Sequence, residues 1–276
     1  MNQSPKAGRD ETVDILDVLL GGRLRIIQGS RGYRLSLDAL LLAYFAEVSG
    51  AASIIDLGSG NGAVALALAM RAPSARLTGL EIQEKMVERA RRSIALNSFG
   101  DRLSMVHGDV CVIERLFRPG GFDLAVSNPP YRRLNSGRMN LDDEKRTARH
   151  EVRGRLGDFV RAARYLLRHG GRLTVVYPAA RLVDLLQTMR EEGLEPKRIR
   201  MVHSFAGSEA VLVLVEGVKG GGRELEVLPP FVVYEDKKKY TQEMEEVLAG
   251  RLPATSSGGA NARRRVAARR GELPDP

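Results

Sequence analysis

Residues 53–62 of this 276-residue chain read SIIDLGSGNG, in which a strand-like run leads into three closely spaced glycines. Ser53–Leu57 is an apolar run with the length and composition of a buried strand. The helix predicted over Asn61–Arg71 is apolar almost all round, so it should be buried as well. The glycines between them let the backbone approach a ligand closely, and the start of the helix offers free N–H groups. The stretch therefore predicts a strand–loop–helix unit that binds a nucleotide-type cofactor.

Strands and helices alternate from Ser53 onward, which is the pattern of a sheet with helices on both faces. Further strands are predicted at Arg76–Leu80, Leu103–His107, Phe122–Ser127, Arg172–Tyr177, Lys197–His203 and Ala210–Glu216. Further helices are predicted at Glu84–Ser98, around Phe159–Leu167 and at Leu182–Glu191. Because only a short turn joins the last two strands, they should form an antiparallel pair. The sequence thus predicts a Rossmann-like, doubly wound α/β sheet of seven strands, mainly parallel with an antiparallel edge strand.

The start of the chain is predicted to add a small hairpin and a helix to this sheet. Leu24–Gln28 and Gly32–Leu35 have strand character on either side of the turn-type residues 29–31. Ser36 is a good N-cap for a helix over Asp38–Val48.

The chain divides into three predicted regions. Residues 13–50 form the N-terminal hairpin and helix, residues 51–250 the main domain, and residues 251–276 a basic, disordered tail. Within the main domain, a short strand at Glu224–Leu228 and a terminal helix at Asp236–Ala249 are expected.

The charge of the chain favours a polyanionic partner, nucleic acid first, because the formal net charge is +9. Residues 132–155 hold eight Lys and Arg side chains against four acids. The apolar runs are too short for a membrane span. The single cysteine, Cys111, cannot form an internal disulfide and is interpreted as a buried small side chain. We expect a cytoplasmic protein without a metal site, because the His and Cys residues show no ligand spacing.

Polar side chains stand at the ends of four successive predicted strands. They are Asp56, Glu81, Asp109 and Asn128. Ligands of open α/β sheets bind at the carboxyl ends of the strands, so these residues should converge on one crevice. The glycine loop alone leaves the cofactor open, because Gly58-x-Gly60-x-x-Ala63 also fits a dinucleotide fingerprint. In either case Glu81 has the spacing of a carboxylate that binds ribose hydroxyls.

The tetrapeptide Asn128-Pro129-Pro130-Tyr131 ends the fourth of these strands and indicates a clamp for a planar amino group. The prolines stiffen the backbone and remove two N–H donors, which leaves carbonyls to accept hydrogen bonds. The Asn128 amide oxygen and the Pro129 carbonyl can hold the two hydrogens of an exocyclic amine, whose lone pair then faces a methyl donor. Tyr131 offers a face on which a base can stack. Both acceptors would stabilise the positive charge that develops on nitrogen during transfer.

Together, the glycine loop, the strand-end acids and the tetrapeptide resemble the class I amino-methyltransferases, which use S-adenosylmethionine. The segment Gly32–Leu42 (GYRLSLDALLL) narrows the resemblance to the bacterial tRNA(Val) (adenine-N6)-methyltransferases. Thr147–Glu151 (TARHE) is similar to that family too, and the resemblance covers about residues 15–250.

The resemblance implies a role for each residue of the motifs. The cofactor-binding residues would be Asp56, Gly58, Ser59, Gly60, Gly62, Glu81, Ile82, Asp109, Val110 and Asn128, with Ser36 and Asp38 closing the site. The catalytic residues would be Asn128, Pro129 and Tyr131. Substrate contacts would come from Pro130, Tyr131, Arg132, Arg133, Arg149 and His150. The expected reaction is methyl transfer to the exocyclic amino group of adenine in RNA, with tRNA near the anticodon as the substrate.

Other functions stay open at this point. The tetrapeptide is shared with enzymes that methylate guanine in ribosomal RNA, adenine in DNA or a glutamine of release factors. A nicotinamide-dependent oxidoreductase would explain the glycine loop and Glu81 but would leave the tetrapeptide without a role. A non-catalytic RNA-binding module is disfavoured by the intact Asn128 and Tyr131.

Overall fold

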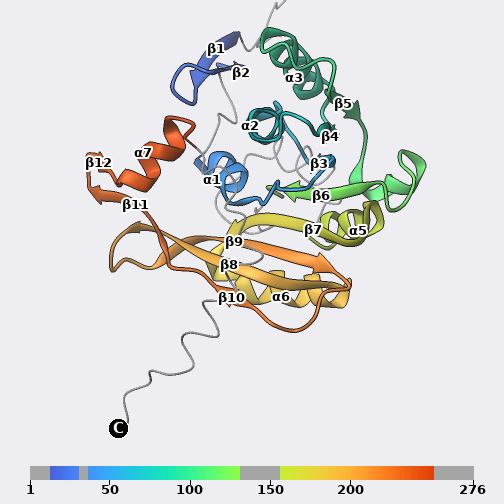
Figure 1. Cartoon of the computed structure of the whole chain (residues 1–276). Coiled ribbons are helices and arrows are strands. Elements are labelled where there is room, and N and C mark those ends of the chain that lie inside the picture. The colour runs from blue at the N-terminus through green and yellow to red at the C-terminus, as the bar shows by residue number, and fades with distance from the viewer. Residues whose placement is uncertain (1–12, 31–36, 131–155, 252–276) are drawn as a thin grey trace, which may run out of the picture.

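The computed structural model describes residues 13–30, 37–130 and 156–251, and a single large sheet forms its centre (Figure 1). The strands of this sheet are β3 (Ser53–Leu57), β4 (Arg76–Glu81), β5 (Leu103–His107), β6 (Phe122–Ser127), β7 (Leu167–Pro178), β8 (Leu194–Phe205), β9 (Ala210–Lys219), β10 (Glu226–Val227), β11 (Phe231–Asp236) and β12 (Lys239–Tyr240). Their order is β12-β11-β8-β9-β7-β6-β3-β4-β5, and β10 pairs with β8.

The seven predicted strands all form and run as the sequence predicts. Strands β5, β4, β3, β6 and β7 are parallel neighbours, whereas β9 is antiparallel to both β7 and β8. The mainly parallel sheet with an antiparallel end is therefore confirmed. Strands β10, β11 and β12 extend the sheet beyond β8.

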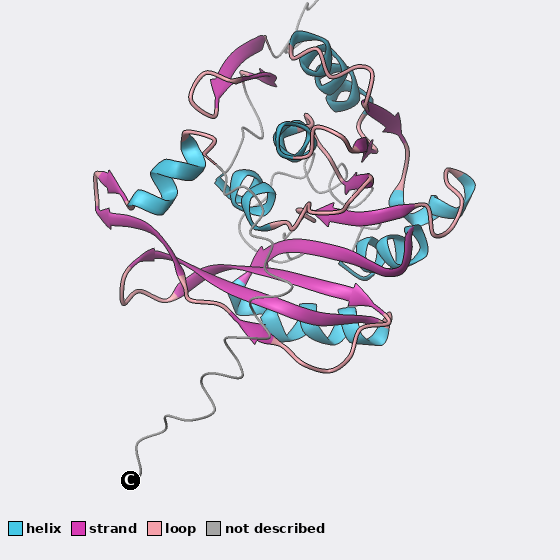
Figure 2. Ribbon diagram, in the orientation of Figure 1, coloured by secondary structure: helices cyan, strands magenta, loops and turns pink. Residues whose placement is uncertain are grey.

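Helices cover both faces of the sheet and enclose two hydrophobic cores (Figure 2). One face carries α1 (Leu37–Phe45), α2 (Ala63–Arg71), α3 (Glu84–Leu96) and α7 (Gln242–Leu248); the other carries the 3-10 helix η1 (Val110–Arg115), α5 (Leu156–Leu166) and α6 (Leu182–Glu191), with the short η2 (Ala179–Arg181) before α6. Successive strand residues point to opposite faces, so Ile54 joins the first core and Ile55 the second. Within the described residues, no helix is long and apolar enough to cross a membrane.

The N-terminal hairpin exists, and its predicted strand Leu24–Gln28 is confirmed as β2 (Leu24–Gly29), but its observed partner is an earlier segment. Strand β2 pairs antiparallel with β1 (Asp14–Leu19), and the turn lies at residues 20–23. Gly21 and Gly22, which both have positive φ, supply the turn of this observed hairpin. The predicted partner strand, Gly32–Leu35, lies outside the described residues, as do residues 1–12 and 252–276.

The end of the main domain also differs from the prediction. The helix predicted over Asp236–Ala249 begins only at Gln242, because the residues before it form β12 and pair with β11. Thr241 caps this helix, and its side-chain oxygen accepts a hydrogen bond from the Met244 N–H at 3.3 Å. Strand β11 was missed, although its apolar run after two prolines is a strand signal.

A polar network fastens α7 to the rest of the fold. Both Glu243 carboxylate oxygens accept hydrogen bonds from the Arg200 guanidinium of β8, at 2.7 and 2.8 Å. The Tyr44 hydroxyl of α1 donates to the same carboxylate at 2.7 Å. Burial, and then the hydrogen bond to Glu243, raise the pKa of the Tyr44 phenol to about 12.

Replacing Glu243 by Ala should lower the free energy of unfolding by about 1–3 kcal/mol, because Arg200 and Tyr44 would lose their shared acceptor. Urea titration followed by circular dichroism measures this change. Glu245→Ala is the matched control, because Glu245 lies on the same helix and is exposed. Equal stabilities of the two variants would contradict the anchoring role of Glu243.

Candidate active site

The carboxyl ends of four neighbouring strands are level with one another. Leu57 at the end of β3 is the register partner of Ser127 in β6 and of Leu80 in β4. Glu81 at the end of β4 is in turn opposite His107 in β5. The residues that follow each strand therefore emerge along one edge of the sheet, as the sequence predicts (Figure 1).

The glycine loop after β3 has the left-handed backbone that its sequence requires. Gly58, Gly60 and Gly62 have φ values of 72°, 57° and 85°, and Gly62 is the N-cap of α2. The N–H groups of Gly58 and Ser59 both donate to the Leu80 carbonyl at 2.9 Å. The loop is thus bound to the neighbouring strand β4.

The three glycines have different neighbours. A Cβ on Gly58 would lie 2.9 Å from a ring carbon of Phe159, and one on Gly62 would lie 3.1 Å from the Ala90 side chain. A Cβ on Gly60 would meet no described atom within 4 Å. Gly58 and Gly62 therefore allow close packing, whereas the described residues leave open space beside Gly60.

Glu81 joins the glycine loop to β4. Its two carboxylate oxygens accept one hydrogen bond each, from the Gly60 N–H at 2.9 Å and from the Gln83 N–H at 2.8 Å. The side chain is buried. These two bonds fix the carboxylate, and each oxygen has a second lone pair with which it can accept from a ligand hydroxyl.

Asp56 lies beneath the glycine loop and is buried, with an exposed fraction of 2%. Its carboxylate accepts a hydrogen bond from the Ser59 hydroxyl at 2.6 Å. Burial raises its pKa to about 7, while the bonds from Ser59 and from the Ala65 N–H oppose that rise. Its expected role in cofactor binding stays a prediction.

The segments that follow β4 and β5 contain three predicted cofactor-binding residues, Ile82, Asp109 and Val110. Asp109 is the N-cap of η1, and its carboxylate accepts a hydrogen bond from the Cys111 N–H at 2.9 Å. Val110 is buried, whereas Ile82 is exposed at 38%. Cys111 is exposed, contrary to its interpretation as a buried side chain, because it lies in the first turn of a surface helix.

The tetrapeptide begins directly beside the glycine loop. The Ser127 hydroxyl donates to the Leu57 carbonyl at 2.9 Å, which joins the ends of β6 and β3. Asn128 and Gly58, the residues that follow these two partners, are therefore neighbours. Asn128 is partly buried, Pro129 is buried and Pro130 is exposed.

Of the predicted site residues not yet placed, one lies in the described part of the chain. Asp38 lies in the first turn of α1. The residues that lie outside the described part of the chain are Ser36, Tyr131, Arg132, Arg133, Arg149 and His150. Among the residues that are described, no group of His, Cys, Asp and Glu side chains is arranged to hold a metal.

Two neighbours of the glycine loop were not predicted from the sequence. Phe159 of α5 packs against Gly58. Gln28 of β2 accepts a hydrogen bond from the side-chain amide of Asn61, a residue of the loop itself. The only sequence signal for Gln28 is a polar residue that directly follows the apolar pair Ile26 and Ile27.

The matching family model decides which kind of protein this is. The model of the methyltransferase small domain matches residues 37–192, which include the glycine loop, Glu81, Asp109 and Asn128. The chain belongs to this family. This family match contradicts the hypothesis of a nicotinamide-dependent oxidoreductase.

Named relatives of this methyltransferase act on tRNA. The tRNA1(Val) (adenine(37)-N6)-methyltransferase of Porphyromonas gingivalis is 34% identical over 207 residues, which cover 72% of this chain and 80% of the relative. The enzyme of the same name from Vibrio campbellii is 30% identical over 171 residues, which cover 62% of this chain and 70% of the relative.

Solved methyltransferase structures share the fold. A predicted O-methyltransferase from Agrobacterium tumefaciens superposes with a TM-score of 0.63 at 26% identity, over 78% of this chain and 96% of that one. A 16S rRNA N2 methyltransferase of Thermus thermophilus, solved with AdoMet and guanosine, superposes with a TM-score of 0.52 at 21% identity, over 75% of this chain and 50% of that one. The second likeness concerns the fold alone.

The stability of the protein should depend on the protonation of Asp56. Its pKa is about 7 in the folded protein and near 3.8 when unfolded, so the folded state binds the proton more tightly. Stability from this group is therefore greatest below about pH 4 and falls as the pH rises to about 7, by on the order of 4 kcal/mol. Asp56→Asn should remove this slope in urea titrations across that range. Asp101 is exposed, so Asp101→Asn should keep this pH dependence and serves as the control. An unchanged slope in Asp56→Asn would show that Asp56 is not the group responsible.

Two glycine substitutions should show that Gly58 is tightly packed and that Gly60 is not. Gly58→Ala should destabilise the protein by roughly 1–3 kcal/mol more than Gly60→Ala, because only the first new methyl group would clash with Phe159. Both variants carry a similar cost for their positive φ, on the order of 1–2 kcal/mol. Thermal unfolding of the two variants measures the difference, and equal losses would mean that Phe159 yields to the methyl group.

Proposed function

We propose that this methyltransferase transfers a methyl group from S-adenosylmethionine to the exocyclic amino group of an adenine in tRNA, beside the anticodon. The observation that carries the proposal is the register of β3 and β6, which makes Asn128 the neighbour of Gly58. An amine held at Asn128 would thus lie next to whatever the glycine loop binds. The names of the curated relatives supply the tRNA and the adenine.

The residues at the strand ends fit the proposed cofactor. The space above Gly60 would admit the methionine portion close to the backbone. The second lone pairs of the Glu81 carboxylate would accept from the ribose hydroxyls, and the exposed Ile82 side chain would cover one face of the adenine. When bound, the cofactor would supply an electrophilic methyl group on a sulfonium.

Asn128 and Pro129 would orient the amine that receives the methyl group. The nitrogen lone pair of an aminopurine is delocalised into the ring, so it is a weak nucleophile. Acceptance of one amine hydrogen by the Asn128 side-chain oxygen and of the other by the Pro129 carbonyl would direct the lone pair toward the methyl donor. The same two oxygens would stabilise the positive charge that grows on nitrogen. Because proton loss can follow transfer, these residues need not include a strong base.

The charge of the chain supports RNA as the substrate. The net charge of +9 and the basic stretch 132–155, which follows the tetrapeptide, would favour contacts to phosphates. Tyr131 would stack on the target base, which must leave its own stack to reach Asn128. A nucleotide in an anticodon loop meets that requirement at low cost. Arg132, Arg133, Arg149 and His150 are the proposed contacts beyond the base.

A methyl-transfer assay tests the proposal. The protein and labelled S-adenosylmethionine would be incubated with unmodified tRNA, ribosomal RNA, DNA and release factor in parallel, followed by nucleoside mass spectrometry. We expect N6-methyladenine in tRNA alone. Label in ribosomal RNA guanine or release-factor glutamine would keep the site chemistry and replace the proposed substrate.

Asn128→Ala links that activity to the tetrapeptide. Loss of one of the two amine acceptors should lower kcat by about 100-fold to 1,000-fold. The affinity for S-adenosylhomocysteine, measured by calorimetry, should change far less, because the glycine loop and Glu81 remain. A variant that keeps its kcat would overturn the catalytic role of Asn128.

A further inference from the structure

The N-terminal hairpin reaches the glycine loop through one buried amide. Gln28, at the end of β2, is exposed by only 3%. Its Nε2 donates to Asp17 of β1 at 2.6 Å, and its Oε1 accepts from Asn61 Nδ2 at 3.2 Å. The Asp17 carboxylate is an acceptor only, so it fixes which end of the Gln28 amide faces β1 and leaves the oxygen for Asn61.

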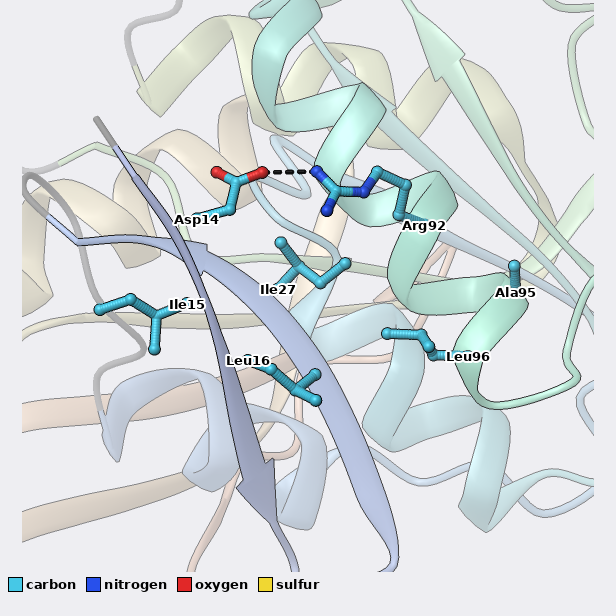
Figure 3. Close-up of a pocket in the computed structure, with 7 residues that line it drawn as sticks. All are labelled: Asp14, Ile15, Leu16, Ile27, Arg92, Ala95 and Leu96. Atoms are coloured by element: carbon cyan, nitrogen blue, oxygen red, sulfur yellow. Dashed lines mark hydrogen bonds and ion pairs between the residues drawn. The ribbon is translucent and has the colours of Figure 1, made fainter. Parts of the chain in front are cut away.

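Polar contacts hold the hairpin firmly on α3. Asp14 of β1 forms ion pairs with Arg89 and Arg92 of α3, and Figure 3 shows Asp14 and Arg92 facing each other across the groove between hairpin and helix. The Ile27 N–H of β2 donates to the Ser93 hydroxyl at 2.9 Å.

Asn97 continues this attachment at the other end of β2. Its side-chain amide accepts from the Arg25 N–H at 2.9 Å and donates to the Arg25 carbonyl at 2.6 Å. The side chain thus makes the pair of hydrogen bonds to the Arg25 backbone that a neighbouring strand would make. The hairpin is a fixed support from which Gln28 can act.

Asn61 lies in the part of the loop with the greatest backbone freedom. It stands between Gly60 and Gly62, which both have positive φ. Glycine loses more conformational freedom than other residues when it is ordered, so a loop of this kind needs tethers to stay in one conformation. Glu81 of β4 holds Gly60, and Gln28 of β2 holds Asn61.

We propose that Gln28 is a positioning residue for the cofactor loop, and that the Asp17–Gln28–Asn61 chain of hydrogen bonds orders the loop before the cofactor binds. The hairpin then contributes to cofactor affinity without touching the cofactor. The affinity increases because the glycine loop is already ordered, so cofactor binding does not have to bear the entropic cost of ordering it. That the ligand is S-adenosylmethionine rests on the proposed function, whereas the tether itself does not.

Exchanging the amide of Gln28 and the carboxylate of Asp17 tests the proposal. Gln28→Glu keeps an acceptor for Asn61 but sets a carboxylate against Asp17, so the chain of hydrogen bonds is broken. Adding Asp17→Asn supplies an amide donor to the new carboxylate and restores both hydrogen bonds of the Asp17–Gln28–Asn61 chain. Asp17→Asn alone is the matched control, because its amide oxygen can still accept from Gln28.

The readouts are the affinity for S-adenosylhomocysteine by calorimetry, amide hydrogen exchange of residues 58–62 without ligand, and urea unfolding. We expect Gln28→Glu to weaken binding about tenfold and to speed exchange in the loop, and the double variant to return both to within about threefold of wild type. Urea unfolding verifies that each variant is folded under the binding conditions.

Three outcomes separate the alternatives. Unchanged loop exchange and unchanged affinity in a folded Gln28→Glu variant would overturn the positioning role. Loss in Gln28→Glu that the double variant fails to restore would show a general packing effect and would overturn it as well. A wild-type protein that does not bind S-adenosylhomocysteine would overturn the proposed function, while the exchange data would still decide the tether.

Discussion

The alignment of the parallel strands is the constraint on which the rest of the site depends. β3 lies between β6 and β4, and its residues Ile54, Ile55 and Leu57 are almost fully buried. Register with both neighbours brings three chain segments to one level: the glycine loop, Glu81 and Asn128. No side chain of the site has to be long to reach its neighbours. A slip of one residue in either pairing would turn every side chain of a strand to the opposite face and would disrupt both cores.

Polar groups of β2, β3 and β4 hold the glycine loop. Its backbone donates to the Leu80 carbonyl and to Glu81, and its side chains contact Asp56 and Gln28. This matters because a loop with three left-handed glycines has little conformational preference of its own. Burial of Asp56 beneath it has an electrostatic cost that raises the pKa of that carboxyl. The loop therefore combines close approach to a ligand with polar tethers that fix its shape.

Much of this arrangement could be predicted from local sequence. The apolar runs that form β3 to β9 are short and bounded by loops, and their ends identify Glu81, Asp109 and Asn128. The hairpin turn could not be chosen by the same means, because residues 20–23 and 29–31 both have turn composition. Long-range contacts could not be predicted from the local sequence either. Gln28 and Asn61 are 33 residues apart, and nothing in either segment indicates the other. Phe159 was predicted as a helix residue, but its contact with Gly58 depends on how α5 packs.

A crystal structure with S-adenosylhomocysteine and adenosine would test whether the carboxyl ends of the parallel strands bring the methyl donor and the amine together. We expect the ribose hydroxyls of the cofactor on the Glu81 carboxylate, and the adenosine amino group between the Asn128 side-chain oxygen and the Pro129 carbonyl. The cofactor sulfur should face that amine. A cofactor bound away from the Gly58–Gly62 loop, or an amine held by groups other than Asn128 and Pro129, would contradict this expectation.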